Sequence, residues 1–402
     1  MRAYILPTDF TIDPFGDHPS DSLIGNRALR DLQAGVLYSL GIPLQRAGSL
    51  SEVEQSDERL LITDSVFFST ELVREFIETS RKRGRSTVCA LKPGLFTHHS
   101  LVTTQKVSVH PDRVEYGLRY DPGRGRSGEA EPVVIDPEGF SQPFPMPAHV
   151  LGGSELRIPL TTKAIVQLDH WANIWAANMA LLLARLARLR VAPKPRLFTL
   201  VLWARSLNKW RLLTKCNCVG RGCDIHPTAY VEASNIGDNV MIGAGSVVRA
   251  SIIGNGVSIG SNSTVECSVI GDGCAIDSNS ATFCSVLYPG TATSTRQILA
   301  SLCGRDTFVA DGVFLADYRF DGRTVAVNVN GRMVDTGSVA LGPCLGHGVY
   351  LGAGCVVPPG RAIPNGLRIV PEDTRSIVGP DADGTIPGHR IVVKADEQPQ
   401  EP

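Results

Sequence analysis

From Val219 onward the chain repeats with a fixed step of 17 residues, through VGRGCDIHPTAYVEASN, IGDNVMIGAGSVVRASI, IGNGVSIGSNSTVECSV and IGDGCAIDSNSATFCSV. The repeat aligns three columns of mostly aliphatic residues: Val219, Ile236, Ile253 and Ile270; Ile225, Ile242, Ile259 and Ile276; Val231, Val248, Val265 and Thr282. Gly, Asn and Asp recur between the columns, and these residues tolerate the positive φ of tight corners. Three inward-facing ladders predict a three-sided prism, the left-handed parallel β-helix of hexapeptide repeats. An ordinary β-sandwich would not keep one period over four turns.

The repeat is interrupted once. Its register is lost after Leu287 and returns in LGPCLGHGVYLGAGCVVPPGRAIPNG, from Leu341 to Gly366. We therefore predict a β-helix domain over residues 216–380 with an excursion at about 288–340, followed by a C-terminal tail over 381–402. A segment that leaves a solenoid usually lies over one of its sides, where it can shape a pocket.

The first half of the chain has a different pattern. Residues 2–6 and 60–64 are typical of buried strands, and residues 21–40 and 70–83 are typical of amphipathic helices. This alternation predicts an α/β domain of Rossmann type over residues 1–160. Two apolar helical stretches then predict a helical connector over residues 161–215.

Composition narrows the function classes. With 39 Lys plus Arg against 40 Asp plus Glu, the net charge of -1 lacks the basic footprint of a nucleic-acid-binding protein. The ten Cys, often beside small apolar residues, predict free thiols in a reducing compartment, and we expect a cytoplasmic protein. The sequence has neither a signal-peptide pattern nor an apolar stretch long enough to cross a bilayer.

The connector is locally basic. Leu181 to Arg221 contains ten Lys or Arg and no acidic residue. A basic, apolar helix pair suits peripheral contact with a membrane, but helices packed between two domains have the same pattern. Polar residues such as Asp169 and Asn173 make the first helix too polar to span a bilayer.

Several segments of the two halves occur in an order that can be compared with a known family. In the second half, ADYRFDGRTVAVNVNGRMVDTGSVALGPCLGHGVYLGAGCVVPPGRAIPNG combines an Asn-containing turn, a short hairpin, a Thr-Gly pair and closing coils. In the first half, DSLIGNRALRDLQAGVLYSLGI, LLITDSVFFSTELVREFI and HWANIWAANMALL follow one another. With these segments the chain resembles the bifunctional sugar-1-phosphate nucleotidyltransferase and acetyltransferase family (N-acetylglucosamine-1-phosphate uridyltransferase-like). The resemblance implies a nucleotidyltransferase-like first domain and an acyltransferase β-helix.

The resemblance makes Asp64 the candidate metal ligand of the first domain, for Mg²⁺, if nucleotidyl transfer persists. The family begins with a Gly-rich loop that wraps nucleotide phosphates, whereas this chain has ILPTDFTIDPFGDHPSD. Asp9, Asp13 and Asp17 would repel an anion there. The lysine of the family's Asn-Lys-Pro string is also replaced, because this chain has Asn26, Arg27 and Ala28. We therefore predict that the first domain is a degenerate nucleotidyltransferase-like domain.

The resemblance also places an acyl-acceptor site in the excursion. The family's catalytic His and its Tyr are absent from the matching string, Leu299 to Arg305, but Asp317 falls where the family has a substrate-binding Asn. Asp317 is therefore one candidate base, and His347, at a corner of the prism where polar residues are often merely solvated, is a second. The candidate substrate-binding residues nearby are Gln297, Arg305, Tyr318 and Arg319. Alternatively, Asp317 forms a structural ion pair with Arg305 or Arg319.

Arg361 and Arg368 flank the last coil, where related acyltransferases receive the phosphates of coenzyme A; an exposed charged end is the alternative. We predict a homotrimer that transfers an acyl group from acetyl-CoA or another acyl-CoA to a sugar phosphate, a nucleotide sugar or a related small amine or hydroxyl acceptor. Two alternatives stay open: a sugar-1-phosphate nucleotidyltransferase, and a catalytically silent subunit that binds a sugar nucleotide or serves as a scaffold.

Overall fold

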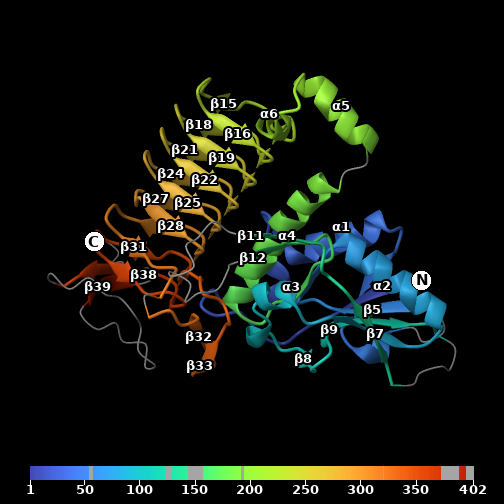
Figure 1. Ribbon diagram of the computed structural model, residues 1–402. Helices are drawn as coiled ribbons and strands as arrows, with labels where there is room; N and C mark the ends of the chain where they lie inside the picture. The colour runs from blue at the N-terminus through green and yellow to red at the C-terminus, as the bar shows by residue number, and fades with distance from the viewer. Residues whose placement is uncertain are drawn as a thin grey trace. The chain divides into compact units, whose positions relative to one another are not determined.

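The computed structural model describes residues 1–53, 58–123, 129–143, 157–191, 194–319, 321–372 and 389–394. The chain divides into two compact units (Figure 1). The first comprises Met1–Ile12 and Gly16–Arg188, and the second comprises Asp13–Phe15 and Leu189–Pro402. The structure thus places one boundary at residue 188, inside the predicted connector 161–215. Most of the predicted tail 381–402 lies outside the described residues.

A mixed sheet with the strand order β10-β7-β9-β5-β1-β4 forms the first unit, and β8 pairs with β9. Strand β1 is parallel to β4 and β5, and β10 is parallel to β7, whereas β9 runs antiparallel to both its neighbours β5 and β7. The strands are β1 (Arg2–Leu6), β4 (Leu44–Arg46), β5 (Arg59–Thr63), β7 (Thr87–Leu91), β8 (Ser108–Val109), β9 (Val114–Asp121) and β10 (Glu131–Ile135). The predicted α/β class is confirmed.

Helices and three small two-stranded sheets complete the first unit. The helices are α1 (Leu29–Ser39), α2 (Thr70–Arg83), α3 (Leu95–His99) and α4 (Trp171–Arg190). The paired short strands are β2 (Leu23–Ile24) with β3 (Arg27–Ala28), β6 (Val66–Phe68) with β13 (Ile165–Gln167), and β11 (Phe140–Pro143) with β12 (Arg157–Leu160).

The two predicted helices of this unit differ in outcome. Helix α2 matches the predicted residues 70–83, because the Ser69 side chain accepts a hydrogen bond from Leu72 N at its start and Gly84 adopts φ 62° at its end. The helix predicted over 21–40 begins only at Leu29. Gly25 (φ 58°) and Asn26 (φ 63°) form the two-residue turn of the β2–β3 hairpin instead.

The second unit is a left-handed parallel β-helix with three faces (Figure 1). Face 1 contains β14 (Cys218–Val219), β17 (Asn235–Ile236), β20 (Ile252–Ile253), β23 (Val269–Ile270), β26 (Val286–Leu287), β29 (Leu302–Cys303), β34 (Cys344–Leu345) and β37 (Ala362–Ile363). Face 2 contains β15 (Asp224–Ile225), β18 (Met241–Ile242), β21 (Ser258–Ile259), β24 (Ala275–Ile276), β27 (Ala292–Thr293), β30 (Phe308–Val309), β35 (Tyr350–Leu351), β38 (Leu367–Pro371) and β39 (His389–Lys394). Face 3 contains β16 (Tyr230–Glu232), β19 (Val247–Arg249), β22 (Thr264–Glu266), β25 (Ala281–Phe283), β28 (Gln297–Leu299), β31 (Phe314–Leu315) and β36 (Val356–Val357).

The predicted inward ladders form the core of this prism. Ile236, Ile242 and Val248, from three successive faces of one coil, are all at most 5% exposed, and the same columns stay buried in the coils that follow. At the open end of the stack Val219 is 52% exposed, because β14 has a neighbouring strand on one side only. The repeat therefore fixes both the interior and the three faces.

The predicted start of the excursion, at about residue 288, is wrong. Coils continue through β26 to β31, and the chain leaves the prism only after Leu315. The 17-residue register is lost earlier because one corner is shorter: three residues separate Thr293 from Gln297, where four separate Ile276 from Ala281. The true excursion contains the hairpin β32 (Ala326–Val329) with β33 (Arg332–Asp335).

One corner of the prism departs from the predicted use of Gly, Asn and Asp. Ala and Cys adopt the left-handed conformation there, with φ between 46° and 49°, at Ala233, Ala250, Cys267, Cys284 and Ala300. A buried serine follows each of them and donates its hydroxyl to the carbonyl two residues earlier, as Ser251 does to Arg249 O at 2.6 Å. The same hydroxyl accepts the amide of the next serine, so a continuous ladder holds the strained corner.

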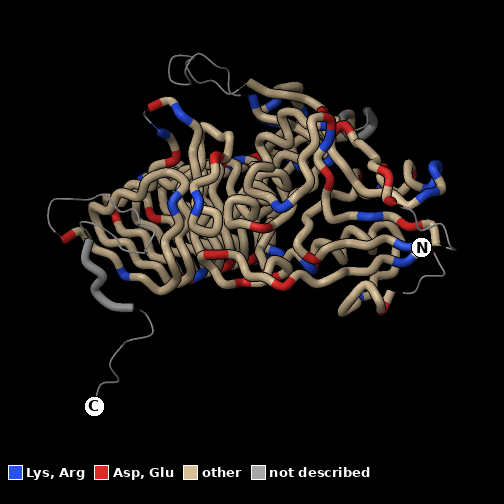
Figure 2. Tube along the Cα trace, turned by 90° about the horizontal axis from the view of Figure 1, so that it is seen from below, with Lys and Arg blue, Asp and Glu red and all other residues tan. Residues whose placement is uncertain are grey.

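None of the ten cysteines is joined in a disulfide bond in the structure. In the described residues no helix is both long and apolar enough to cross a membrane. Basic and acidic residues are interspersed over the face seen in Figure 2.

Candidate functional site

Asp317 lies where the chain leaves the prism. Leu341, where the chain returns, donates its amide to the carbonyl oxygen of Asp317 at 2.8 Å, and Tyr318 pairs with Ala340 as an antiparallel bridge. The hairpin β32–β33 is thus carried on a neck whose two strands meet at Asp317. The coils still stack directly across this point, because β29, β30 and β31 pair with β34, β35 and β36, so the excursion leaves the prism without breaking its sheets.

The Asp317 carboxyl group is half-buried, and burial raises its pKa above the usual range for aspartate. Within the described residues no cation forms an ion pair with it. Arg319 instead pairs with Asp321, whose pKa that guanidinium lowers, and Arg305 contacts His347. The alternative in which Asp317 is a structural ion-pair partner of Arg305 or Arg319 is therefore wrong.

His347 is held by Arg305 from the neighbouring coil. Its Nδ1 accepts the Arg305 amide at 2.9 Å, and its Nε2 lies 2.9 Å from Arg305 Nη1. The backbone amide of His347 donates to Asn365 Oδ1 at 2.7 Å, and its ring lies 4.8 Å from that of Phe15. With both ring nitrogens facing donors of one arginine, this geometry favours the structural role at a corner over proton transfer.

The remaining candidate substrate residues are dispersed. Gln297 is exposed on face 3. It lies three residues before the corner at Ala300, which neighbours Asp317 on the next coil, and three residues of extended strand span about 10 Å. Tyr318 is adjacent to Asp317 in the neck, and the Arg319 side chain is engaged with Asp321. Arg305 lies at a different corner of the prism, between faces 1 and 2. Of this set, only Tyr318 and Arg319 lie beside Asp317, and they do so because they follow it directly in the sequence.

Arg361 and Arg368 lie at different places on the last coil. Arg361 directly precedes face 1 and donates from Nη1 to Met333 Sδ of the hairpin at 3.5 Å. Arg368 lies on face 2 with its guanidinium carbon 4.8 Å from the Tyr350 ring, which in turn packs 5.9 Å from Phe308. Its Nε is buried and has no hydrogen-bond partner in the described part of the chain. The two arginines do not converge on one anion site.

Asp64 follows β5 in the first unit and is buried. Its Oδ1 accepts two hydrogen bonds from Thr8, from the amide at 3.0 Å and from the hydroxyl at 2.7 Å. His18 Nε2 lies 3.6 Å from Oδ2 and 2.9 Å from the Thr8 carbonyl oxygen. The loop that stands in place of a phosphate-binding loop is therefore folded onto this carboxylate.

No preformed cluster of metal ligands surrounds Asp64. Across the ranges that the structure describes, no group of three His, Cys, Asp or Glu side chains is placed to hold a metal ion. Of the two Asp64 oxygens, Oδ1 is engaged by Thr8 and Oδ2 faces His18.

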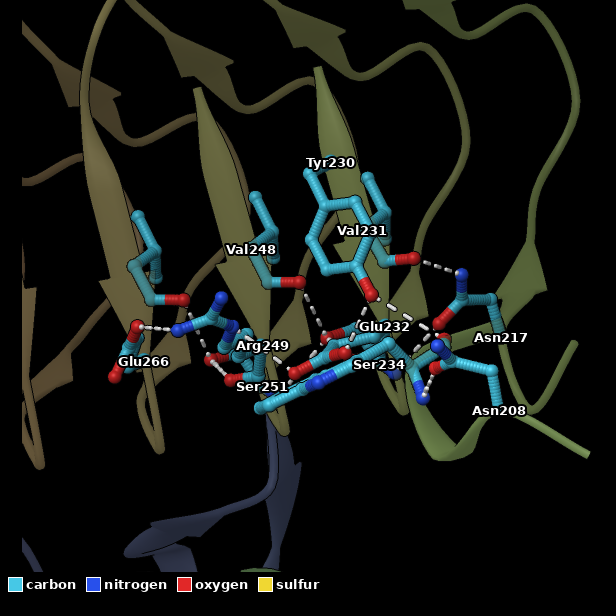
Figure 3. A network of polar contacts seen from close by, with 12 residues as sticks. Asn208, Asn217, Tyr230, Val231, Glu232, Ser234, Val248, Arg249, Ser251 and Glu266 are labelled. Carbon is cyan, nitrogen blue, oxygen red and sulfur yellow. Dashed lines mark hydrogen bonds and ion pairs between the residues drawn. The ribbon is translucent and has the colours of Figure 1, made fainter. Parts of the chain in front are cut away.

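The sequence analysis missed an ionic ladder on the outside of face 3 (Figure 3). Arg249 lies between Glu232, with Nε 2.9 Å from Oε1, and Glu266, with Nη1 2.8 Å from Oε1. The three residues are spaced by 17 and face one another across adjacent coils. Their alternating charge at the repeat spacing is the signal that would have revealed the ladder.

The ladder extends to α6 (Lys209–Thr214), which packs beside β16; the Leu213 carbonyl oxygen accepts the Ala233 amide at 3.1 Å. Tyr230 donates its hydroxyl to Glu232 Oε2 at 2.9 Å and also lies 3.2 Å from the Trp210 carbonyl oxygen. The Arg249 guanidinium carbon is 5.5 Å from the Trp210 ring. Glu232 is only 4% exposed, so this network is a structural clasp rather than an open binding site.

Residues 211–319 match the family model described as the GMPPB C-terminal domain. No curated protein matches the chain. Together with the fold, this match links the second unit to the β-helix domain of sugar-1-phosphate nucleotidyltransferases. The matched region contains the Glu232 ladder and Asp317, and it ends at the neck of the excursion.

Proposed function

We propose that the protein transfers an acyl group, acetyl in the simplest case, from acyl-CoA to an amine or hydroxyl of a sugar phosphate or nucleotide sugar. The observation that carries this proposal is the Asp317 carboxylate, which is half-buried, has a raised pKa and forms no ion pair with another described residue. A carboxylate paired with arginine would be a weak base, whereas one with a raised pKa is a better proton acceptor near neutral pH.

In the proposed reaction the acceptor's nitrogen or oxygen attacks the thioester carbonyl carbon. Asp317 accepts the proton that the nucleophile loses. The carbon–sulfur bond then breaks, and the thiolate leaves and takes up that proton. Tyr318, next to Asp317 in the chain, is positioned in the same neck and supplies a phenol for acceptor recognition.

The resemblance implies that Arg361 and Arg368 together receive the phosphates of coenzyme A, and only one of the two is suitably placed. Arg361 and Arg368 do not converge, and Arg361 is engaged with Met333. Arg368 is the better candidate because its Nε lacks a hydrogen-bond partner among the described residues and its guanidinium carbon lies 4.8 Å from the Tyr350 ring. We also propose a homotrimeric, cytoplasmic protein, in which a neighbouring subunit would complete each site.

A second candidate function is a subunit that binds a sugar nucleotide without turnover. The engagement of Asp64 by Thr8 and of His347 by Arg305 favours it, because two of the candidate functional side chains are held by the protein itself. The two functions differ in product formation and share ligand binding.

The test is release of free thiol from acetyl-CoA, measured with a thiol reagent against amino-sugar phosphates, nucleotide amino sugars and buffer alone. Acceptor-dependent thiol release supports acyl transfer. A rise in melting temperature with a nucleotide sugar but no thiol release supports the silent subunit, since a ligand that binds the folded state stabilises it. Absence of both effects would contradict both functions.

The nucleotidyltransferase alternative leads to a separate prediction. The chain should not release pyrophosphate from a nucleoside triphosphate and a sugar-1-phosphate in a coupled assay with Mg²⁺. The reason is that Thr8 and His18 surround the Asp64 carboxylate and the loop lacks a glycine cradle for the phosphates. Thr8→Val removes the hydroxyl that donates to Asp64 Oδ1 and is the matched control. It should also release no pyrophosphate, because the glycine cradle for the phosphates is still missing. Turnover in the unmodified chain would restore the alternative.

A further inference from the structure

Helix α5 (Lys194–Ala204) and helix α6 follow one another in the second unit (Figure 1). With the residues joining them, these helices expose an apolar and basic surface. We call it the α5–α6 surface and define it by two sets of exposed residues, the apolar Phe198, Leu202, Trp203, Leu207 and Trp210 and the basic Arg205, Lys209, Arg211 and Lys215. It belongs entirely to the second unit. None of the residues argued above for catalysis lies on it.

The apolar part is unusually exposed for a folded protein. Phe198 and Trp203 are 63% and 65% exposed, and Leu207, in the connection, is 85% exposed. Phe198 and Leu202 are four residues apart and so lie on one side of α5. Single exposed leucines need no explanation, but five large apolar side chains on two successive helices and the connection between them indicate a surface that is covered in use.

The basic part surrounds these side chains without compensating acids. In the portion of the chain that the structure describes, none of the four cations forms an ion pair with a carboxylate. Lys215 Nζ lies 5.5 Å from the Trp203 ring, and Lys209 Nζ lies 4.6 Å from the Trp210 ring. The stretch Leu181 to Arg221 has no acidic residue at all, although the whole chain has a net charge of -1.

We propose that the α5–α6 surface binds peripherally to a membrane rich in anionic lipid. Exposed Trp rings with Lys ammonium groups beside them suit the boundary of a bilayer, where indole rings sit among headgroups and ammonium groups meet phosphates. The 11 residues of α5 are too short to cross a bilayer, so the helix would lie in the plane of the interface. A protein partner would instead have to supply an acidic face with an apolar centre.

The experiment uses the full chain and vesicles of phosphatidylcholine alone or with 30 mole per cent phosphatidylglycerol. We expect at least tenfold more protein to sediment with the anionic vesicles at low salt, and a fall of at least fivefold in half-molar salt, because charges at an exposed surface are screened. Bromine-labelled acyl chains should quench tryptophan fluorescence. Equal sedimentation with both vesicle types, or none with either, would overturn the proposal.

Two variants separate membrane insertion from general stickiness. Trp203→Ser with Leu207→Ser should reduce sedimentation with anionic vesicles at least tenfold, and Tyr38→Ser with Leu50→Ser, which removes two exposed apolar side chains elsewhere, should leave it unchanged. Arg205→Gln with Arg211→Gln should flatten the salt dependence. If the first pair instead changes the sedimentation coefficient without vesicles present, the surface joins copies of the chain and the proposal fails.

Discussion

Replacing Asp317 by Asn should lower the rate of acyl transfer by about tenfold or more and leave the melting temperature unchanged or slightly raised. The amide has nearly the shape of the carboxylate but cannot accept the acceptor's proton. Because the carboxylate has no ion-pair partner in the described structure, removing its charge breaks no salt bridge. The measurements are thiol release at saturating substrates and thermal unfolding of the same preparations.

The sign of the stability change follows from the raised pKa of Asp317. A carboxyl group whose pKa is higher in the folded than in the unfolded state favours folding while it is protonated, and this contribution is lost as pH rises through the folded-state pKa. At neutral pH the charged group therefore opposes folding, and Asn removes that cost. The activity of the unmodified protein should rise with pH through the same raised pKa, above the range of an exposed aspartate.

Asp321→Asn is the matched control for Asp317→Asn. It removes a carboxylate from the same excursion, but one that is exposed and paired with Arg319. We expect its turnover to stay within about twofold of the unmodified protein, since an exposed ion pair contributes little. A drop in the melting temperature of Asp317→Asn with unchanged turnover would show that Asp317 is structural and would refute its role as the base.

The β-helix could be predicted from sequence because its determinant is periodic. Each coil places an aliphatic residue at the same inward positions, so residues such as Ile242 and Ile259 independently indicate the same repeat. The end of that periodicity was misjudged for a physical reason. A corner shortened by one residue at residues 294–296 shifts the alignment while leaving the backbone pairing intact, as Ala281 and Gln297 still pair.

The candidate site was less predictable because its determinants are not local. Asp317 could be proposed from the family resemblance, because it falls at the place of a substrate-binding Asn, but its lack of an ion pair depends on where Arg305 and Arg319 turn. Arg305 turns to His347, which is 42 residues further along the chain. Arg361 and Arg368 are seven positions apart in sequence, yet a corner of the prism separates them onto different faces. Side-chain direction at corners is what the sequence pattern does not specify.

The same limit applies to the first unit. The loss of the glycine-rich loop was visible in the sequence, but the consequence, Thr8 bound to Asp64 by two hydrogen bonds, depends on contacts between residues 56 positions apart. The hairpin turn at Gly25 and Asn26 is a local signal that was available. It was overridden by the helical spacing of apolar residues around it.

Replacing Arg249 by Met should lower the free energy of unfolding of the second unit by about 3 kcal/mol. Glu232 has a side chain only 6% exposed, and Arg249 is its counter-charge at 2.9 Å, so the substitution leaves a buried carboxylate without a cation. The value lies at the lower end for a broken buried pair because Arg249 itself is 38% exposed. For a unit of this size the melting temperature should fall by about 6–12 °C.

A double-mutant cycle separates this electrostatic cost from lost packing. Arg249→Met combined with Glu232→Gln removes both charges, and Tyr230 can still donate its hydroxyl to the amide oxygen, so more than half of the loss should be recovered. Arg296→Met, at an exposed arginine of the same unit, should change the melting temperature by less than about 2 °C. If the double variant is no more stable than Arg249→Met alone, the clasp acts through the packing of Arg249 on Trp210, because only an uncompensated charge is relieved by neutralising Glu232.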